Sequence, residues 1–397
     1  MQWVIGQRKR SSGADYKVLS FVNIQALRRG FALLGWALAC LAVLHAVPAR
    51  ARDALPEWPL MGPLQTRNLS PFSLLRMDFM PPPAAARQRP GWDLDARLTH
   101  ANSFVKTENV KNYLRARGQP RTLTAQDVQA LLATPGDVLY FDGEITALDL
   151  TARYVHDRHW TGYVNLPLLF YGGGILDDAI DGFHQAFGFT SAERDLVADN
   201  EYQAVIRHSG DTLVLLDAPS GVQVGDPVLG VRFASEFANE AFAIIEGAVK
   251  LPVGDADNYV SSGAVDYGLQ LTLQKQLGRH GLYLSVAHQW LGEAERFPNA
   301  FRSQASEASV AYEFGFTRHT ATVLQTSWSK AAFKTGNGPL ATDELLASLG
   351  LRHWRANVAY DFSLTENHGN YDNTKDVAAT LGVSWRLPGN PVNPPIN

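Results

Sequence analysis

Hydrophobic and polar residues alternate along most of the chain from Trp92 onward, which is the pattern of β-strands with one apolar and one polar face. In the segment 265–274 every second residue is apolar, and the residues between them are mainly polar. Comparable segments lie at 92–106, 137–155, 157–170, 226–237, 240–253, 261–276, 280–292, 303–316, 318–330, 341–353, 354–366 and 374–387. We therefore predict about twelve strands, most of them longer than the ~5–6 residues of a typical soluble strand.

The connections between the predicted strands alternate between short and long. The chain reverses within a few residues near 156–158, 238–239, 277–279, 317 and 354, whereas the connections 107–136, 171–225, 254–260, 293–302, 331–340 and 367–373 are longer. Tight turns on one side and long loops on the other are typical of outer-membrane barrels. The predicted fold is all-β: a transmembrane antiparallel up-and-down β-barrel of about twelve strands, with short helices in its outer loops.

A soluble periplasmic β-sandwich is the main alternative, because alternation does not say which face points inward. A closed barrel of about twelve strands has a lumen too wide for side chains to fill, so an apolar interior would leave a large void. A polar lumen and an apolar outer belt in lipid satisfy every predicted strand, and this interpretation is favoured.

The first 51 residues are typical of an export signal, with a basic lead, an apolar run at 31–47 and a small-x-small site at 49–51. A single membrane anchor is the alternative, although the run falls short of the ~20 residues that span a bilayer. We expect cleavage after about Ala51 and location in the outer membrane. Residues 52–91 are predicted to be an extended periplasmic lead-in segment, residues 92–387 the barrel and residues 388–397 a C-terminal tail.

Charge and cysteine content narrow the function classes. Of 35 basic and 39 acidic residues, seven and one lie within 1–51, so 28 and 38 remain, a net charge of −10. An exported chain with excess negative charge is not expected to bind nucleic acid. The one cysteine, Cys40, lies in the signal, so the mature chain needs no disulfide. The predicted partners are outer-membrane lipid, the barrel-assembly machinery and a small solute, with no cofactor and no metal.

Two outer loops are predicted to contain helices. One spans about 124–133 and begins at Thr124, a typical N-cap residue. The other spans about 175–187, follows Gly172, Gly173 and Gly174, and has an apolar stripe opposite Asp177, Asp181 and His184. We expect the three glycines to fold this helix back across the outer mouth, where the acidic face would form a constriction; solvated helix-end aspartates are the alternative.

The polar faces of the predicted strands supply the candidate pore-lining residues. These residues are Glu246, Lys250, Asp266, Gln270, Gln274, Glu313, Arg352, Arg355, Asn357, Asp361 and Arg386. Their mixed charge predicts a transverse field across a pore rather than a filter of one sign. Internal salt bridges that satisfy buried charges are an equally good interpretation.

Five sequence blocks follow one another along the chain: GPLQTRNLSP at 62–71, ANSF at 101–104, FDGE at 141–144, LPLLFYGGGILDDAIDGFHQAFGF at 166–189 and GVQVGDPVLG at 221–230. In these blocks the chain resembles a bacterial family of outer-membrane β-barrels that is catalogued only as a domain of unknown function. The resemblance implies location and architecture but no catalytic residue, substrate or cofactor. The chain departs from the usual barrel ending, because Trp385 and Leu387 are followed by a tail.

The sequence therefore favours a channel or transporter for small solutes. A lipid-modifying enzyme is the second hypothesis, since His100, Asn102, Ser103, Asp142 and Glu144 lie near the outer ends of the first two strands. His100 and Ser103 are three residues apart, so a regular strand would place them on opposite faces, which weighs against a nucleophile pair. A structural or adhesive barrel is the third hypothesis.

Overall fold

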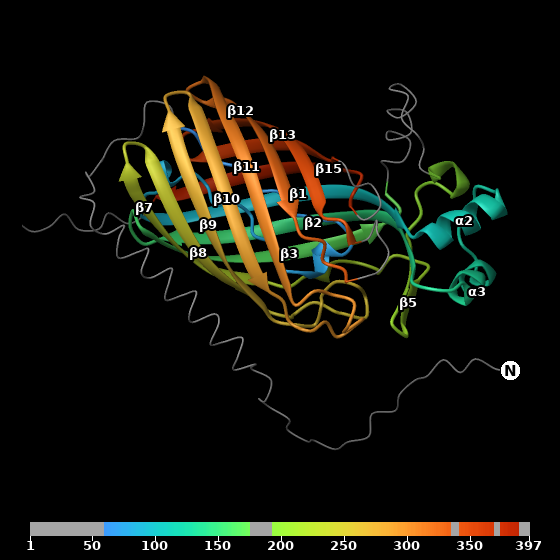
Figure 1. Cartoon of the computed structure of the whole chain (residues 1–397). Helices are drawn as coiled ribbons and strands as arrows, with labels where there is room; N and C mark the ends of the chain where they lie inside the picture. Colours follow the sequence, from blue (N-terminus) through green and yellow to red (C-terminus); the bar gives the residue numbers. More distant parts are fainter. Residues whose placement is uncertain (1–58, 175–192, 335–340, 369–373, 389–397) are drawn as a thin grey trace, which may run out of the picture. The chain divides into compact units, whose positions relative to one another are not determined.

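The computed structural model describes residues 59–174, 193–334, 341–368 and 374–388, and its strands form one closed antiparallel barrel (Figure 1). The barrel closes because the first strand pairs with the last. Its strands are β1 (Gly91–Lys106), β2 (Val138–Val155), β3 (Trp160–Gly172), β7 (Val228–Ala238), β8 (Ala241–Lys250), β9 (Asp266–Leu277), β10 (His280–Trp290), β11 (Gln304–Thr317), β12 (Thr320–Ser329), β13 (Glu344–Arg355), β14 (Val358–Asn367) and β15 (Val377–Pro388). The predicted barrel of about twelve strands is confirmed.

The strands carry apolar side chains outside and polar side chains inside. Along β9, Leu271 and Leu273 are 41% and 40% exposed, whereas Gln270 and Gln274 are 4% and 5% exposed. Burial alternates in the same way along β13 and β14. An outward apolar belt around a polar interior is the pattern of a barrel that spans a membrane, and the predicted orientation of β9 is confirmed. None of the described helices has the length and hydropathy needed to cross a membrane.

Short and long connections lie at opposite ends of the barrel. Residues 156–159, 239–240, 278–279, 318–319 and 356–357 form the tight turns, and we call this end the turn end. The longer connections form the opposite end, the loop end. In outer-membrane barrels the tight turns face the periplasm and the long loops face the outside.

Two helices occupy the connection between β1 and β2: α2 (Glu108–Arg117) and α3 (Ala125–Ala133). Thr124 and Asp127 form a capping box at the start of α3, as the sequence predicts. Burial would raise the pKa of Asp127, but hydrogen bonds from Arg121, Thr124 and Tyr113 lower it below the usual range. The sequence pattern did not predict α2, which buries only Val110 and Leu114.

The connection after β3 contains η3 (Arg194–Leu196), the hairpin of β4 (Gln203–His208) and β5 (Asp211–Leu215), and the short strand β6 (Gln223–Val224). β4 pairs with β2 beyond the point where β3 ends, so the sheet is extended at the loop end. Ser209 and Gly210, both with positive φ, form the turn of this hairpin. The helix predicted at 175–187 lies outside the described residues.

Residues 59–90 lie inside the barrel, and we call this segment the plug. It is extended except for two short turns, η1 (Ser73–Leu75) and η2 (Ala85–Arg87), and it runs between the strands in Figure 1, coloured blue. Leu64 and Leu69 are fully buried, and backbone amides along the plug donate to inward side chains of the wall. The prediction of a periplasmic lead-in is therefore wrong for residues 59–90, because their backbone groups find their partners in the lumen.

Candidate functional site: the plugged lumen

The plug is a hairpin whose two arms both leave the lumen at the turn end. The first arm passes Glu313 and Gln325 on its way toward the loop end, and the second returns past Asp266 to Gln274, near the turn end of β9. The arms contact each other through the amide of Ala84, which donates to the carbonyl of Met61 at 2.9 Å. The plug therefore enters and leaves the lumen at the same end and does not pass through the barrel from one end to the other.

Wall side chains accept the backbone amides that an extended segment would otherwise leave unpaired. Glu313 accepts from the amides of Met61 at 3.0 Å and Gly62 at 2.8 Å. Gln325 accepts from Leu64 at 2.9 Å, and Gln274 accepts from Ala85 at 2.8 Å. Because unpaired buried amides are costly, these bonds fix the plug in one register against the wall.

Gly62 allows the two arms to approach closely. Its φ is +101°, and a Cβ atom there would lie 2.6 Å from the backbone nitrogen of Ala84. Its amide donates to Glu313, and its carbonyl accepts from Arg352 at 2.8 Å. A side chain at this position would therefore strain the backbone and displace the second arm.

An ion pair in the interior holds the middle of the first arm. Arg67 donates to Asp149 through Nη2 at 2.6 Å and through Nε at 2.9 Å, and it also donates to Asn165. The side chains of Arg67 and Asp149 are 7% and 2% exposed. A bidentate pair with so little solvent access is strong and geometrically specific.

An apolar cluster closes the lumen at the loop end. At the apex of the plug, Leu69, Phe72, Leu74 and Leu75 are at most 6% exposed. They pack with apolar residues of the strands and long connections, including Val105, Leu139, Phe141, Ile145, Leu169, Tyr259, Phe297, Phe301 and Phe333. This cluster differs from the polar walls below it, because exposing its apolar side chains to water costs free energy.

Most of the predicted pore-lining residues face the interior, where the charged ones are paired. Eight of them are buried: Glu246, Lys250, Asp266, Gln270, Gln274, Glu313, Arg352 and Asp361. Glu246 pairs with Arg232 at 2.5 Å, Lys250 with Asp226 at 2.6 Å, and Arg352 with Glu313 at 3.5 Å. The structure therefore favours the interpretation of these charges as internal salt bridges and plug contacts.

The other three predicted residues lie at the turn end. Arg355 is exposed because it follows the buried Trp354, and the inward positions of β13 are the even ones up to that point. The prediction of Arg355 as a pore residue is wrong. Asn357 is exposed in the next tight turn, but it lines a cavity at the turn end. Arg386 lines the same cavity and pairs with Asp93 at 2.7 Å.

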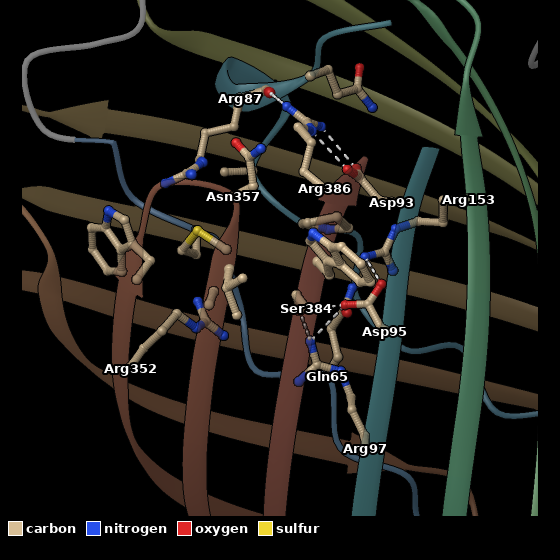
Figure 2. Close-up of a pocket in the computed structure, with 18 of the residues that line it drawn as sticks. Gln65, Arg87, Asp93, Asp95, Arg97, Arg153, Arg352, Asn357, Ser384 and Arg386 are labelled. Atoms are coloured by element: carbon tan, nitrogen blue, oxygen red, sulfur yellow. Dashed lines mark hydrogen bonds and ion pairs between the residues drawn. The ribbon is translucent and has the colours of Figure 1, made fainter. Parts of the chain in front are cut away.

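The cavity at the turn end has a volume of about 100 Å³ and is rich in arginine. Figure 2 shows Arg87 and Arg352 on one side of it and Arg153 on the other, with Arg386 near Asp93. Arg97 completes the set, and it donates to Asp361 at 2.6 Å and to Asp95 at 3.2 Å. Five guanidinium groups therefore surround one small space, together with the carboxylates of Asp93 and Asp95.

Arg87 is the least neutralised of these arginines. Its Nη1 donates to the carbonyl of Pro59 at 2.6 Å, and it forms no ion pair within the described residues. Burial and the neighbouring charge of Arg386 lower the pKa of Arg87 to about 10, so the side chain is still charged at neutral pH. The guanidinium lies over the ring of Trp354, at 5.7 Å from its centroid.

The glycine block at the end of β3 allows close contacts of the backbone. A Cβ atom on Gly173 would lie 1.7 Å from the carbonyl oxygen of Asn200, and one on Gly174 would lie 1.7 Å from the carboxyl group of Glu144. Gly172 ends β3. The remaining constriction candidates, Asp177, Asp181 and His184, lie outside the described residues, so the constriction stays a prediction.

The residues considered for an enzyme are not arranged as a serine–histidine pair. Ser103 is buried on β1, whereas His100 is on the opposite face and contacts Glu144 at 2.6 Å and Thr146 at 2.7 Å. Asn102 donates to the same glutamate. Asp142 pairs with Arg194. These contacts satisfy buried polar groups where β1 and β2 extend toward α2.

Several residues of the site were not predicted. Asp95, Arg97 and Asp149 are inward polar positions on β1 and β2, and the alternation used for the later strands would have found them. Arg67 had no such signal, because the segment around it has no strand period. Its burial is explained by its ion pair with Asp149 in the lumen, which the sequence around Arg67 does not indicate.

Residues 114–387 match the model of a family described as "Protein of unknown function (DUF3187)". No curated protein sequence matches the chain. Among solved structures, the COG4313 outer membrane channel from Pseudomonas putida F1 is 10% identical, with 78% of this chain and 100% of that chain covered and a TM-score of 0.49. The NanC porin is 9% identical, with 74% of this chain and 100% of the porin covered and a TM-score of 0.40. The translocator domain of the autotransporter NalP from Neisseria meningitidis is 7% identical, with 75% of this chain and 90% of that domain covered and a TM-score of 0.37. At these identities the likeness concerns the barrel fold alone.

Proposed function

The chain belongs to the DUF3187 family, and we propose that it is an outer-membrane channel for small solutes that its own plug closes at rest. The family is described only as proteins of unknown function, so the activity is inferred from the site. The observation that carries this proposal is the way the plug is held. Along the polar wall its partners are hydrogen-bonding side chains such as Glu313, Gln325 and Gln274. Water can take over such bonds when a segment leaves, so a polar lumen remains satisfied without the plug.

The path of the plug supports the same proposal. Both arms leave at the turn end, so the hairpin is able to withdraw without breaking a strand pairing. The apolar apex opposes withdrawal, at roughly 1.5–3 kcal/mol for each large side chain brought into water. Four such residues lie there, Leu69, Phe72, Leu74 and Leu75. The closed state is therefore the resting state, and opening requires a solute or another source of free energy.

The connection 171–225 forms the second part of the proposal, in which the segment 175–187 narrows the outer mouth. Gly173 and Gly174, which precede this segment, support it, because their backbone lies so close to Asn200 and Glu144 at the loop end that no Cβ atom would fit there. The polar face with Asp177, Asp181 and His184 would then meet the solute and favour cations.

Replacing residues 172–187 with a short Gly/Ser linker tests this part of the proposal. The replacement is made in a variant that also lacks the plug, so that current is measurable. Single-channel recordings in planar bilayers should show a higher conductance and a weaker preference for cations than the plug-free parent, because a narrow acidic point has been removed. The same conductance and selectivity in a folded, heat-modifiable replacement would contradict the constriction and leave the plugged channel untouched.

A further inference from the structure

The arginine cavity at the turn end offers more hydrogen-bond donors than its carboxylates use. Each guanidinium group has five N–H donors. The carboxylates paired with this set are those of Asp93, Asp95, Asp361 and Glu313, and Arg87 has none of them as an ion-pair partner. Five arginines with four carboxylates leave a net positive charge around a partly enclosed space. Such a space attracts an anion.

A residue that lines the cavity has a buried donor without a partner among the described residues. Arg153 is 6% exposed and lines the cavity, and one of its nitrogens donates to Asp95. Its Nε has no hydrogen-bond partner within the part of the chain that the structure describes. Buried unpaired donors are rare and costly, and an acceptor in the cavity would satisfy this one.

The other lining residues define the shape of the anion. Met61, Pro83 and Trp354 give the cavity an apolar part next to Arg87, whose guanidinium lies over the Trp354 ring. Its volume of about 100 Å³ is smaller than the ~150 Å³ apolar cavity that accommodates benzene. A planar carboxylate matches the guanidinium fork, and a short carbon chain matches the apolar part.

We propose that this cavity is a binding site for a small aliphatic carboxylate of a few carbon atoms, held by Arg87 and Arg153 with its carbon chain toward Trp354. The proposal rests on the proposed function, because the carboxylate would be a ligand of the closed plug at the turn end and not the solute that the acidic outer mouth favours. Arg87 belongs to the plug and Arg153 to β2, so a bound carboxylate would contact both the plug and the wall.

Isothermal titration calorimetry of the mature protein in detergent, at low chloride, tests the site with propionate and with propionamide, its uncharged analogue. Propionate should give saturable binding and propionamide none. Arg87→Gln should bind propionate at least about tenfold more weakly, since one charge-assisted hydrogen bond is lost. Arg355→Gln is the matched control, because Arg355 is exposed and does not line the cavity, and it should bind like the wild type.

Arg87→Lys distinguishes ligand binding from damage to the plug. Lysine retains the charge and a donor for Pro59 but lacks the planar fork, so binding should fall between that of the wild type and Arg87→Gln. No saturable heat with propionate, equal affinity in Arg87→Gln and Arg355→Gln, or binding of phosphate without propionate would overturn the proposal. If the plug-free variant conducts while any of these results is found, only the carboxylate site fails and the channel stands.

Discussion

A variant that lacks residues 59–88 is expected to conduct ions as an open pore, whereas the intact mature protein is expected to show rare openings. The deletion removes both arms of the plug and its apolar apex, and it leaves the lumen lined by polar groups that water can solvate. The mean current in planar bilayers should rise by roughly tenfold or more, as expected when a filled barrel becomes a hydrated one.

A peptide with the sequence of residues 59–90 provides the control for this deletion. Added on the turn side, it should close the pore, because the wall still presents Glu313, Gln325 and Gln274 to its backbone. A peptide of the same composition in scrambled order should leave the current unchanged. If the deletion variant is folded and heat-modifiable yet conducts no better than the intact protein, the plug is not what closes the lumen.

Substitution of Arg67 by methionine is expected to loosen the plug. It leaves the carboxylate of Asp149, 2% exposed, without its bidentate partner. Removing one member of a buried ion pair costs about 3–5 kcal/mol, because the remaining charge stays in a poor environment. Release of the plug hydrates that charge, so the fraction of time spent open should increase by about a hundredfold or more, read from single-channel recordings.

The double variant Arg67→Met with Asp149→Leu separates the ion pair from a general loss of packing. Replacing both members of a buried pair with apolar groups is often nearly neutral, so the double variant should open less often than Arg67→Met. Equal open fractions in the single and double variants would show that the unpaired charge is not the cause.

The sequence predicted the barrel well because a strand in a membrane barrel has two contrasting environments. Lipid on one side and a polar lumen on the other impose a period of two, and Leu271 and Gln270 are adjacent residues on opposite faces. The rule fails where a turn is misplaced. The sequence pattern placed the turn at 354 and Arg355 in the following strand, but β13 continues to Arg355, so the alternation directs Trp354 inward and Arg355 outward.

The plug could not be predicted in the same way. Its extended backbone pairs with wall side chains rather than with a neighbouring strand, and the wall residues lie about 190 to 260 positions away in the chain, as Gln274 does from Ala85 and Gln325 from Leu64. No local period results from such contacts. Some of the charges in the lumen, such as Asp266 and Glu313, were predicted, but their role depended on which other residues filled the space. Arg67 and Asp149 form a pair only once the plug is inside.

The claim that residues 59–90 fill the lumen is tested most directly by the chemical accessibility of a single cysteine at position 64. The mature chain has no cysteine of its own if the signal is cleaved as predicted, so a labelled residue is unambiguous. Leu64 is fully buried against Tyr283, Ala311 and Val323 on the barrel wall, whereas Arg355 is exposed at the turn end. With a membrane-impermeant maleimide and the protein in detergent, Leu64→Cys should react at least about tenfold more slowly than Arg355→Cys, because the reagent must wait for the plug to open. Deletion of the apex residues 69–75 should remove that protection. Equal labelling rates for Leu64→Cys and Arg355→Cys in the otherwise intact protein would contradict a plugged lumen.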